Sequence, residues 1–152
     1  MTIKKLLFYT FIIALIDQIT KLVVVSIITP HNPIRIIPQF FNLVLTYNKG
    51  VAFGFMSDWS EIFRLVVISI TSVLAIGILI WMYFSTYRNS QTHCLAIAMI
   101  LGGALGNIID RVRIGQVVDF LDFYIAHWHW PAFNFADSCI CIGVFILIMV
   151  KE

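Results

Sequence analysis

Two aspartates at the edges of apolar segments are the strongest candidates for chemistry in this chain. Asp119 lies in "GQVVDF", and Asp137 lies in "FNFAD" at the start of a long apolar run. Neither carboxylate has a cation beside it in the sequence. Two carboxylates that approach each other in a poorly solvated site share a proton, because the pKa of one of them rises. Such a pair offers one acid and one base, which suffice to activate a water and to protonate a leaving amine.

Other catalytic chemistries lack a matching sequence pattern. No serine or cysteine stands in a context that pairs a nucleophile with a base, and no HExxH sequence is present. The stretch "HWHW" places His127 and His129 two residues apart but offers no third ligand, and its aromatic rings are typical of a membrane interface. The three cysteines are an odd number without metal-binding spacing. We therefore expect neither a metal nor another cofactor.

Further polar side chains interrupt the apolar segments at a similar depth. Asp17 and Lys21 are spaced i,i+4, and Asn134 stands three residues before Asp137, a spacing that predicts one shared helix face. Asn107 comes near the end of another apolar run. A charged residue inside a span costs roughly 2.5–3.5 kcal/mol, so it faces the interior of the helix bundle. With a rise of about 1.5 Å per residue, all of these side chains reach the outer half of the membrane.

Simpler interpretations stay open for several of the polar and small residues. Asp17 and Lys21 either neutralise each other as a structural pair or serve the site. Asp110 stands beside Arg111, which predicts a local ion pair at a helix end. The glycines of "LGGALG" favour close packing between helices. Asp122 is predicted to be a solvated loop carboxylate.

The elements that must position these residues are predicted to be membrane spans. The chain is 61% hydrophobic and only 12% charged, whereas a soluble domain has roughly 45–50% apolar and about 25% charged residues. Four runs are long enough to cross a bilayer, at about 6–28, 62–84, 93–109 and 132–150. We expect a single integral-membrane domain over residues 1–152. The net charge of +2, without a basic tract, gives no reason to expect a nucleic-acid partner.

The distribution of basic residues predicts the orientation of these spans. Lys4, Lys5 and Arg88 flank the ends that would face the cytoplasm, so both termini are expected there. The first apolar run is predicted to be a retained helix, because no small-residue cleavage site follows it. The outer connection 29–61 is rich in β-branched and aromatic residues and in proline, which predicts short strands on the membrane surface. The second outer connection, 110–131, is predicted to lie along the interface.

Five motif blocks in order give the chain a family resemblance. They are "DQITK" in the first span, "NKGVAFG" in the first outer connection, "GGALGNIIDR" at the end of the third span, "GQVVDF" after it, and "FNFAD" at the start of the fourth. With these blocks in register on four spans, the chain resembles lipoprotein signal peptidase (signal peptidase II), a bacterial inner-membrane aspartyl peptidase. The resemblance covers nearly the whole chain.

The resemblance implies a fold and a set of site residues. The fold would be an all-α membrane protein with four transmembrane helices, a small extracytoplasmic β-cradle and an interfacial helix. Asp119 and Asp137 would be the catalytic dyad. The positions that would support the site or contact the substrate are Asp17, Lys21, Asn48, Gly50, Gly103, Asn107, Arg111 and Asn134.

The resemblance also implies a substrate and a location. The partner would be a prolipoprotein whose cysteine already carries diacylglyceryl, and cleavage would fall just before that cysteine and release the signal peptide. The protein would be a monomer in the bacterial inner membrane, among membrane lipids, with the active site near the outer, periplasmic face. No cofactor is implied.

A second hypothesis comes from a different class, a small proton- or cation-conducting membrane protein. Asp17, Lys21 and Asp137 would then be relay groups. That function needs polar residues through the full depth of the bilayer, and the inner halves of the later spans lack acidic or basic residues apart from His93 at the rim. A purely structural subunit would leave the gathering of polar residues in the outer layer unexplained.

Overall fold

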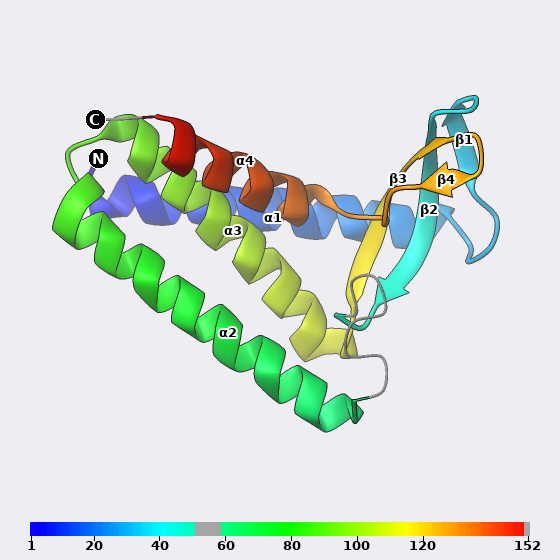
Figure 1. The fold of residues 1–152 in the computed structure, drawn as a ribbon, viewed down its shortest axis with the longest axis horizontal. Helices are drawn as coiled ribbons and strands as arrows, with labels where there is room; N and C mark the ends of the chain where they lie inside the picture. The colour runs from blue at the N-terminus through cyan, green and yellow to red at the C-terminus, as the bar shows by residue number, and fades with distance from the viewer. Residues whose placement is uncertain (51–58, 151–152) are drawn as a thin grey trace.

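The structure, a computed structural model, describes residues 1–50 and 59–150. It is mostly helical, with a small antiparallel sheet at one end of the helices (Figure 1). In chain order the elements are α1 (Ile3–Ile27), β1 (Ile34–Ile37), β2 (Phe41–Asn48), α2 (Glu61–Met82) with the π-helical turn η2 (Tyr83–Tyr87), α3 (Gln91–Ile114), β3 (Val117–Ile125), β4 (Trp128–His129) and α4 (Phe135–Met149). The later residues of the "NKGVAFG" block lie outside the described residues.

Membrane character is confirmed by three long apolar helices in the described part of the chain. They are α1, α2 together with η2, and α3, with 25, 27 and 24 residues. The predicted fourth span, 132–150, corresponds to α4, which has only 15 residues where a full crossing needs about 20. The helix begins later than predicted because Asn134 is its N-cap, so Phe135 is the first helical residue.

Helix α3 is longer than the sequence pattern indicated. It was predicted to end at residue 109, but it continues to Ile114 and stops at Gly115, whose φ of 70° is left-handed. The Gly115 N–H donates to the Arg111 carbonyl, as is common where glycine follows a helix. The predicted interfacial connection 110–131 is therefore the last turn of α3 followed by β3 and β4. Within residues 1–50 and 59–150 no helix corresponds to the predicted interfacial helix.

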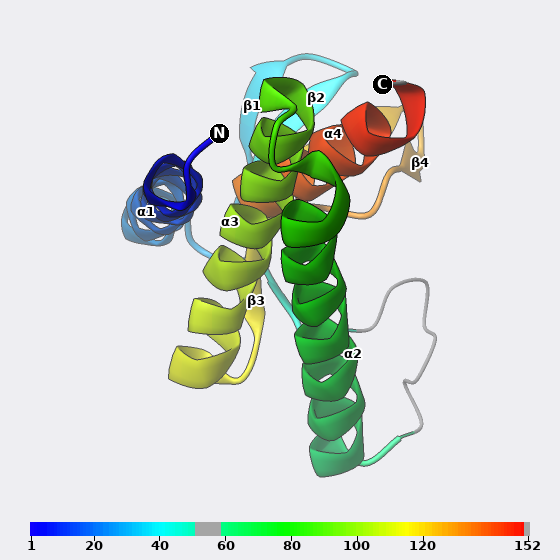
Figure 2. The ribbon, with the colours of Figure 1, turned by 90° about the vertical axis from the view of Figure 1, so that its left-hand side faces the viewer.

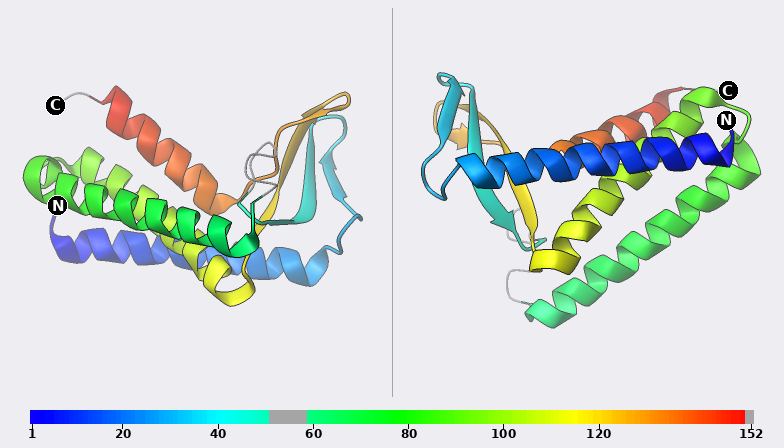
Figure 3. Two further views of the ribbon diagram at one scale, coloured as in Figure 1. Left: turned by 60° about the horizontal axis from the view of Figure 1, so that its bottom comes forward. Right: turned by 180° about the vertical axis from the view of Figure 1, so that it is seen from behind.

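The sheet joins segments that are far apart in the sequence. Its order is β1-β2-β3-β4, and every neighbouring pair is antiparallel. Strand β2 pairs with β3 so that Thr46 lies opposite Asp119 and Asn42 lies opposite Asp122, with an irregular register between Leu43 and Thr46. The sheet extends from the end of α1 that is remote from both termini (Figures 1 and 3). A small antiparallel sheet is thus confirmed, and residues of the second predicted connection contribute β3 and β4 to it.

Helix α3 is the centre of the helical packing, and small residues let its neighbours approach. Figure 2 shows α3 between α1 and α2, with α4 crossing behind. A Cβ at Gly103 would overlap the Ala136 carbonyl of α4, and a Cβ at Gly106 would overlap the Asp17 carboxylate of α1. Because of these close approaches, the polar residues of α1 and those of α4 both lie next to α3. The close approaches confirm the packing role predicted for "LGGALG".

Candidate active site

Asn134 closes the N-terminus of α4 and places Asp137 by hydrogen bonds. The Asn134 side-chain Oδ1 accepts from the Asp137 N–H at 2.9 Å, and Asp137 Oδ2 accepts from the Asn134 N–H at 3.2 Å. This reciprocal arrangement is a capping box, which satisfies backbone donors that a helix end leaves unpaired. Asn134 is therefore the N-cap of α4 and not a residue within the helix, and both side chains contact Asn107 of α3, as their predicted shared face implies.

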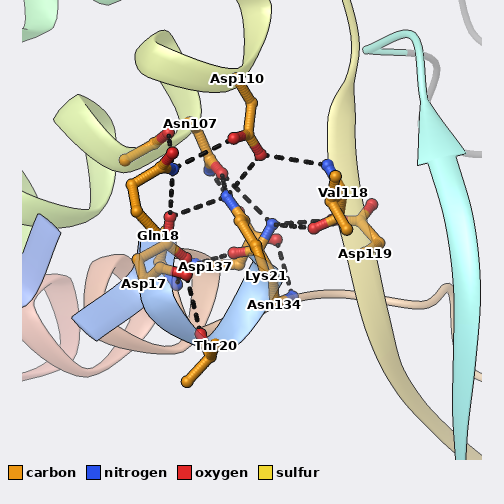
Figure 4. Close-up of polar contacts among 12 residues, drawn as sticks. Asp17, Gln18, Thr20, Lys21, Asn107, Asp110, Val118, Asp119, Asn134 and Asp137 are labelled. Atoms are coloured by element: carbon orange, nitrogen blue, oxygen red, sulfur yellow. Dashed lines mark hydrogen bonds and ion pairs between the residues drawn. The ribbon is translucent and has the colours of Figure 1, made fainter. Parts of the chain in front are cut away.

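The same asparagine also contacts the other carboxylate. Asn134 Nδ2 donates to Asp119 Oδ1 at 2.7 Å and lies 3.2 Å from the Val118 carbonyl. Asn134 is fully buried, so its amide has no competing water contact. Its backbone N–H thus binds Asp137 while its side chain binds Asp119 (Figure 4). The two carboxylates of β3 and α4 are held by one residue.

Asp119 is buried in β3 and is bound from the neighbouring strand. Asn48 Nδ2 of β2 donates to Asp119 Oδ2 at 2.9 Å, and the Gly50 N–H donates to Asn48 Oδ1 at 2.8 Å. That second bond orients the amide so that its nitrogen faces the carboxylate. Gly50 has a φ of 82°, a backbone conformation that favours glycine. Strand pairing and this turn therefore explain why Asn48 and Gly50 accompany Asp119.

The environment of Asp119 changes its acidity. The pKa of Asp119 is raised to about 6, chiefly because burial disfavours the charged carboxylate. The negative charge of Asp137 acts in the same direction, whereas the hydrogen bonds from Asn48 and Asn134 and the charge of Lys21 act in the opposite direction. The desolvated carboxylate is costly because little water reaches it. At pH values near 6 this side chain is able both to hold and to release a proton.

Asp137 is oriented by α3 and, through α3, by α1. Asn107 Nδ2 donates to Asp137 Oδ1 at 2.8 Å, and Lys21 Nζ donates to Asn107 Oδ1 at 2.9 Å. Because a lysine ammonium is only a donor, it fixes which end of the Asn107 amide is the oxygen. Lys21 therefore dictates that Asn107 presents an N–H to Asp137.

Lys21 is the cation of a buried three-residue ion cluster. Its Nζ lies 2.8 Å from Asp17 Oδ2 and 2.9 Å from Asp110 Oδ2. All three side chains are at most 4% exposed. The predicted local pair between Asp110 and Arg111 is therefore wrong. Because α3 continues past residue 109, Asp110 lies on the face of α3 that packs against α1 and meets Lys21 there.

The two aspartates of this cluster hold the backbone on either side of the site. Asp17 Oδ1 accepts from the N–H of Ala136, the residue before Asp137, at 3.0 Å. Asp110 Oδ2 accepts from the N–H of Val118, the residue before Asp119, at 3.1 Å. Each supporting aspartate thus fixes the backbone next to one of the two candidate catalytic aspartates.

Gln18 belongs to this network, although it was not among the predicted site residues. Its Nε2 lies 3.2 Å from Asp17 Oδ2, 3.1 Å from Asp110 Oδ1 and 3.1 Å from the Gly106 carbonyl. The available signal was its position inside "DQITK", where a neutral polar residue follows a charged one within an apolar span. Gln18 bridges α1 and α3 beside the ion cluster.

Three remaining positions lie apart from this hydrogen-bonded network. Gly103 packs against the Ala136 carbonyl, so it sets the distance between α3 and α4. Arg111 is half-buried, and its charge interacts with Asp137, Asp119 and Asp110, in that order of strength. Asp122 was predicted to be solvated but is buried, because the β2–β3 register places it opposite Asn42, which donates to it at 3.0 Å.

The sequence is similar to known proteins over most of its length. The family model described as signal peptidase (SPase) II matches residues 9–151. The chain is 44% identical over 148 residues to the lipoprotein signal peptidase of Syntrophotalea carbinolica, covering 96% of this chain and 89% of the relative. It is 42% identical over 142 residues to the lipoprotein signal peptidase of Janthinobacterium sp., covering 90% of this chain and 81% of that one.

Solved structures show the same fold. A bacterial membrane enzyme determined by the in meso method at 2.3 Å resolution matches with a TM-score of 0.83 and 30% identity, covering 97% of this chain and 87% of the other. A second such structure, at 1.9 Å resolution, matches with a TM-score of 0.82 and 30% identity, covering 97% and 92% of the two chains.

Proposed function

The chain belongs to the signal peptidase II family, and on that premise we propose that it removes the signal peptide from diacylglyceryl-modified prolipoproteins. Cleavage falls at the peptide bond just before the lipidated cysteine. The observation that carries this proposal is the pair of carboxylates, Asp119 and Asp137, which bind the side chain and the backbone of a single asparagine. The relatives at 44% and 42% identity are both lipoprotein signal peptidases.

The proposed mechanism uses the two aspartates as acid and base. Asp137, as the carboxylate, takes a proton from water while the water oxygen attacks the scissile carbonyl carbon. Asp119, in its protonated form, donates to the carbonyl oxygen, which gives a neutral tetrahedral intermediate. The intermediate collapses when its amide nitrogen receives a proton from Asp137, Asp119 takes back the proton of one hydroxyl group, and the carbon–nitrogen bond breaks to give the carboxylic acid and the amine. General acid–base catalysis of this kind contributes about 10²–10⁴-fold to a rate.

The remaining network keeps the dyad in position during this reaction. The Lys21 cluster fixes the backbone before each aspartate and orients Asn107 toward Asp137. Rigid placement is valuable because small displacements of reacting groups slow a reaction strongly. Arg111, whose charge interacts with Asp137 and Asp119, is proposed to contact the substrate near the scissile bond.

The proposed location of the dyad follows from the chemistry of the substrate. The acyl chains of a diacylglyceryl cysteine stay in hydrocarbon, so the scissile bond lies in the headgroup layer. We place both termini in the cytoplasm and the sheet at the outer face of the inner membrane, with α4 as a fourth span. At about 1.5 Å of rise per residue α4 is roughly 22 Å long, and the extended residues before Asn134 complete the crossing.

The discriminating experiment compares two forms of one precursor. Purified protein in lipid nanodiscs is incubated with a prolipoprotein carrying diacylglyceryl on its cysteine and with the same chain lacking the lipid. The proposal expects cleavage of the lipidated form alone, with the new amino terminus at the modified cysteine. Equal cleavage of both forms, or cleavage at another bond, contradicts the proposed substrate and position.

The structure gives no support to the alternative of ion conduction. On the inner side of Asp17, the buried residues of α1 are Leu6 and Ala14, which are apolar. A proton or cation relay needs a series of polar groups across the bilayer. The ion cluster around Lys21 is instead closed by hydrogen bonds to backbone groups next to the two catalytic candidates.

A further inference from the structure

Gln18 of α1 uses both ends of its side-chain amide (Figure 4). Its Nε2 lies 3.1 Å from Asp110 Oδ1, 3.1 Å from the Gly106 carbonyl and 3.2 Å from Asp17 Oδ2. Its Oε1 accepts from Arg113 Nη1 at 3.2 Å. Three acceptors surround the amide nitrogen and a donor meets the oxygen, so only one orientation of the amide satisfies both ends.

These contacts tie α1 to one face of α3. Gly106, Asp110 and Arg113 are spaced by four and three residues, which places them on one side of a helix. Gln18 thus bridges α1 to the final turns of α3. Asp110 on this face holds the backbone before Asp119, so the bridge leads toward the site.

Asp17 keeps a partner on each oxygen without Gln18. Its Oδ1 accepts from the Ala136 N–H at 3.0 Å, and its Oδ2 lies 2.8 Å from Lys21 Nζ. Ala136 immediately precedes Asp137. The backbone beside Asp137 therefore does not rely on Gln18.

Asp110 depends on Gln18 more strongly. Its Oδ2 accepts from the Val118 N–H and pairs with Lys21, whereas its Oδ1 is bound by Gln18 alone among the described residues. The Asp110 side chain is only 4% exposed, so little water is able to replace a lost partner. A buried carboxylate oxygen without a donor is costly. Rotation of the carboxylate to relieve that cost would draw Oδ2 away from Val118.

We propose that Gln18 is a positioning residue for Asp119 and acts through Asp110 and the Val118 N–H. Val118 immediately precedes Asp119 in β3, so a shift of its backbone displaces the carboxylate from the two amides that bind it. The inference rests on the proposed peptidase function. Gln18 contacts no reacting atom, and Asp137 keeps its own support. Loss of Gln18 should therefore lower kcat and leave KM nearly unchanged.

Hydrogen exchange at two backbone amides tests this route without any substrate. Gln18→Met keeps the length of the side chain and removes its donors. In this variant the Val118 N–H should exchange at least about threefold faster than in the parent chain, as the loss of one hydrogen bond allows. The Ala136 N–H, held by Asp17, should exchange at its original rate. Equal acceleration at both amides, or none at Val118, measured by nuclear magnetic resonance in detergent micelles, overturns the route.

A series of substitutions at position 18 separates donation from shape. Gln18→Lys keeps a donor for Asp110 Oδ1, Gln18→Met has none, and Gln18→Glu is isosteric but places a carboxylate against three acceptors. We expect kcat for a lipidated precursor to decrease in that order among the folded variants. The loss in Gln18→Met should be roughly 10–10²-fold, because small displacements slow catalysis strongly. Gln91→Leu, at the exposed first residue of α3, is the control and should keep the parent kcat. Highest activity in Gln18→Glu, or equal activity throughout, overturns the role in donation.

The pH profile of kcat/KM gives a readout that a purely structural role would not move. The amides that bind Asp119 stabilise its charged form, so weaker contacts raise its pKa. The other charges that face Asp119, those of Lys21, Arg111 and Asp137, are the same in both chains. The alkaline limb should therefore move to higher pH in Gln18→Met. A limb that stays in place while kcat falls overturns the proposal. Absence of cleavage by the parent chain would instead refute the peptidase function and leave the hydrogen-exchange test in force.

Discussion

Asn134 carries two tasks at the site, since it caps α4 and binds Asp119. Its Oδ1 accepts from the Asp137 N–H, and its Nδ2 donates to Asp119. Serine at this position retains a capping oxygen but loses the amide donor. The two tasks are therefore separable by substitution.

We expect Asn134→Ser to lose most of the activity while keeping most of the stability. Asn134→Ala should also lose the cap, which lowers the free energy of unfolding by about a further 1 kcal/mol. Cleavage of a lipidated precursor and thermal unfolding in detergent measure the two effects. Full activity in the serine variant would show that the bond from Asn134 Nδ2 to Asp119 is dispensable.

The raised pKa of Asp119 predicts a particular dependence on pH. Its folded pKa of about 6 lies above its ordinary value of 3.8, so the folded chain holds this proton more tightly. The resulting contribution to stability is full below pH 3.8 and is lost as pH rises through about 6. Because the proposed mechanism needs the protonated form, kcat/KM should fall as pH rises through the same range.

Asn48 provides the test of this pH dependence. Its N–H stabilises the charged form of Asp119, so Asn48→Leu should raise the pKa of Asp119 and move the alkaline limb of kcat/KM to higher pH. The measurement is a pH profile of cleavage for both proteins. An alkaline limb that stays in place or moves to lower pH would contradict the role given to this hydrogen bond.

At the scale of single residues, the sequence predicted the members of the network better than their contacts. The motif blocks singled out Lys21, Asn107 and Asn134, and the structure brings them together. The partner of Asp110 and the burial of Asp122 were predicted wrongly. Both depend on the length of α3 and on the β2–β3 register, which bring together residues distant in the sequence.

At the scale of elements, the contact between α3 and α4 determines where Asp137 lies. A Cβ at Gly103 would overlap the Ala136 carbonyl, which immediately precedes Asp137. Gly103→Ala should push α4 away from α3, lowering the free energy of unfolding by roughly 1–3 kcal/mol and reducing activity.

Gly77→Ala is the matched control for this prediction. Gly77 lies in α2, and a Cβ there would meet nothing within 4 Å. This variant should retain activity, measured by cleavage of a lipidated precursor beside thermal unfolding. Equal loss of activity in the two variants would refute the idea that the α3–α4 distance sets the site.

Apolar runs predicted the helices well, but the element ends were less predictable. The start of α4 depends on the Asn134 cap, and the end of α3 depends on Gly115 in a left-handed conformation. Both are polar or small residues that a hydropathy pattern does not weigh. Glycine after a basic last turn is nevertheless a stop signal that the sequence contained.

At the scale of the whole molecule, the sheet lies at the end of the helices opposite to both termini. This arrangement fits the proposed orientation, in which the sheet lies at the outer face of the membrane and both termini lie on its cytoplasmic side. It was predictable only in part, because β2 and β3 pair across the whole length of α2 and α3. A pairing between segments so far apart in the sequence leaves no local pattern.

Labelling of single cysteines tests the proposed orientation. In a variant without the native cysteines, Asn32→Cys in the connection after α1 and Asn89→Cys in the connection before α3 are both exposed positions. A membrane-impermeant maleimide on intact cells without an outer membrane should label position 32 and spare position 89. Labelling only at position 89 would reverse the orientation of the whole chain.

The central claim is that Asp119 and Asp137 together perform the hydrolysis, and isosteric substitution tests it most directly. Asp119→Asn and Asp137→Asn keep the side-chain shape but cannot supply the acid or the base. Under single-turnover conditions with a diacylglyceryl-modified prolipoprotein, each variant should cleave at least about 10²-fold more slowly than the enzyme that keeps both aspartates. The temperature of thermal unfolding should stay the same in each variant. Cleavage at an unchanged rate by either folded variant would contradict the dyad.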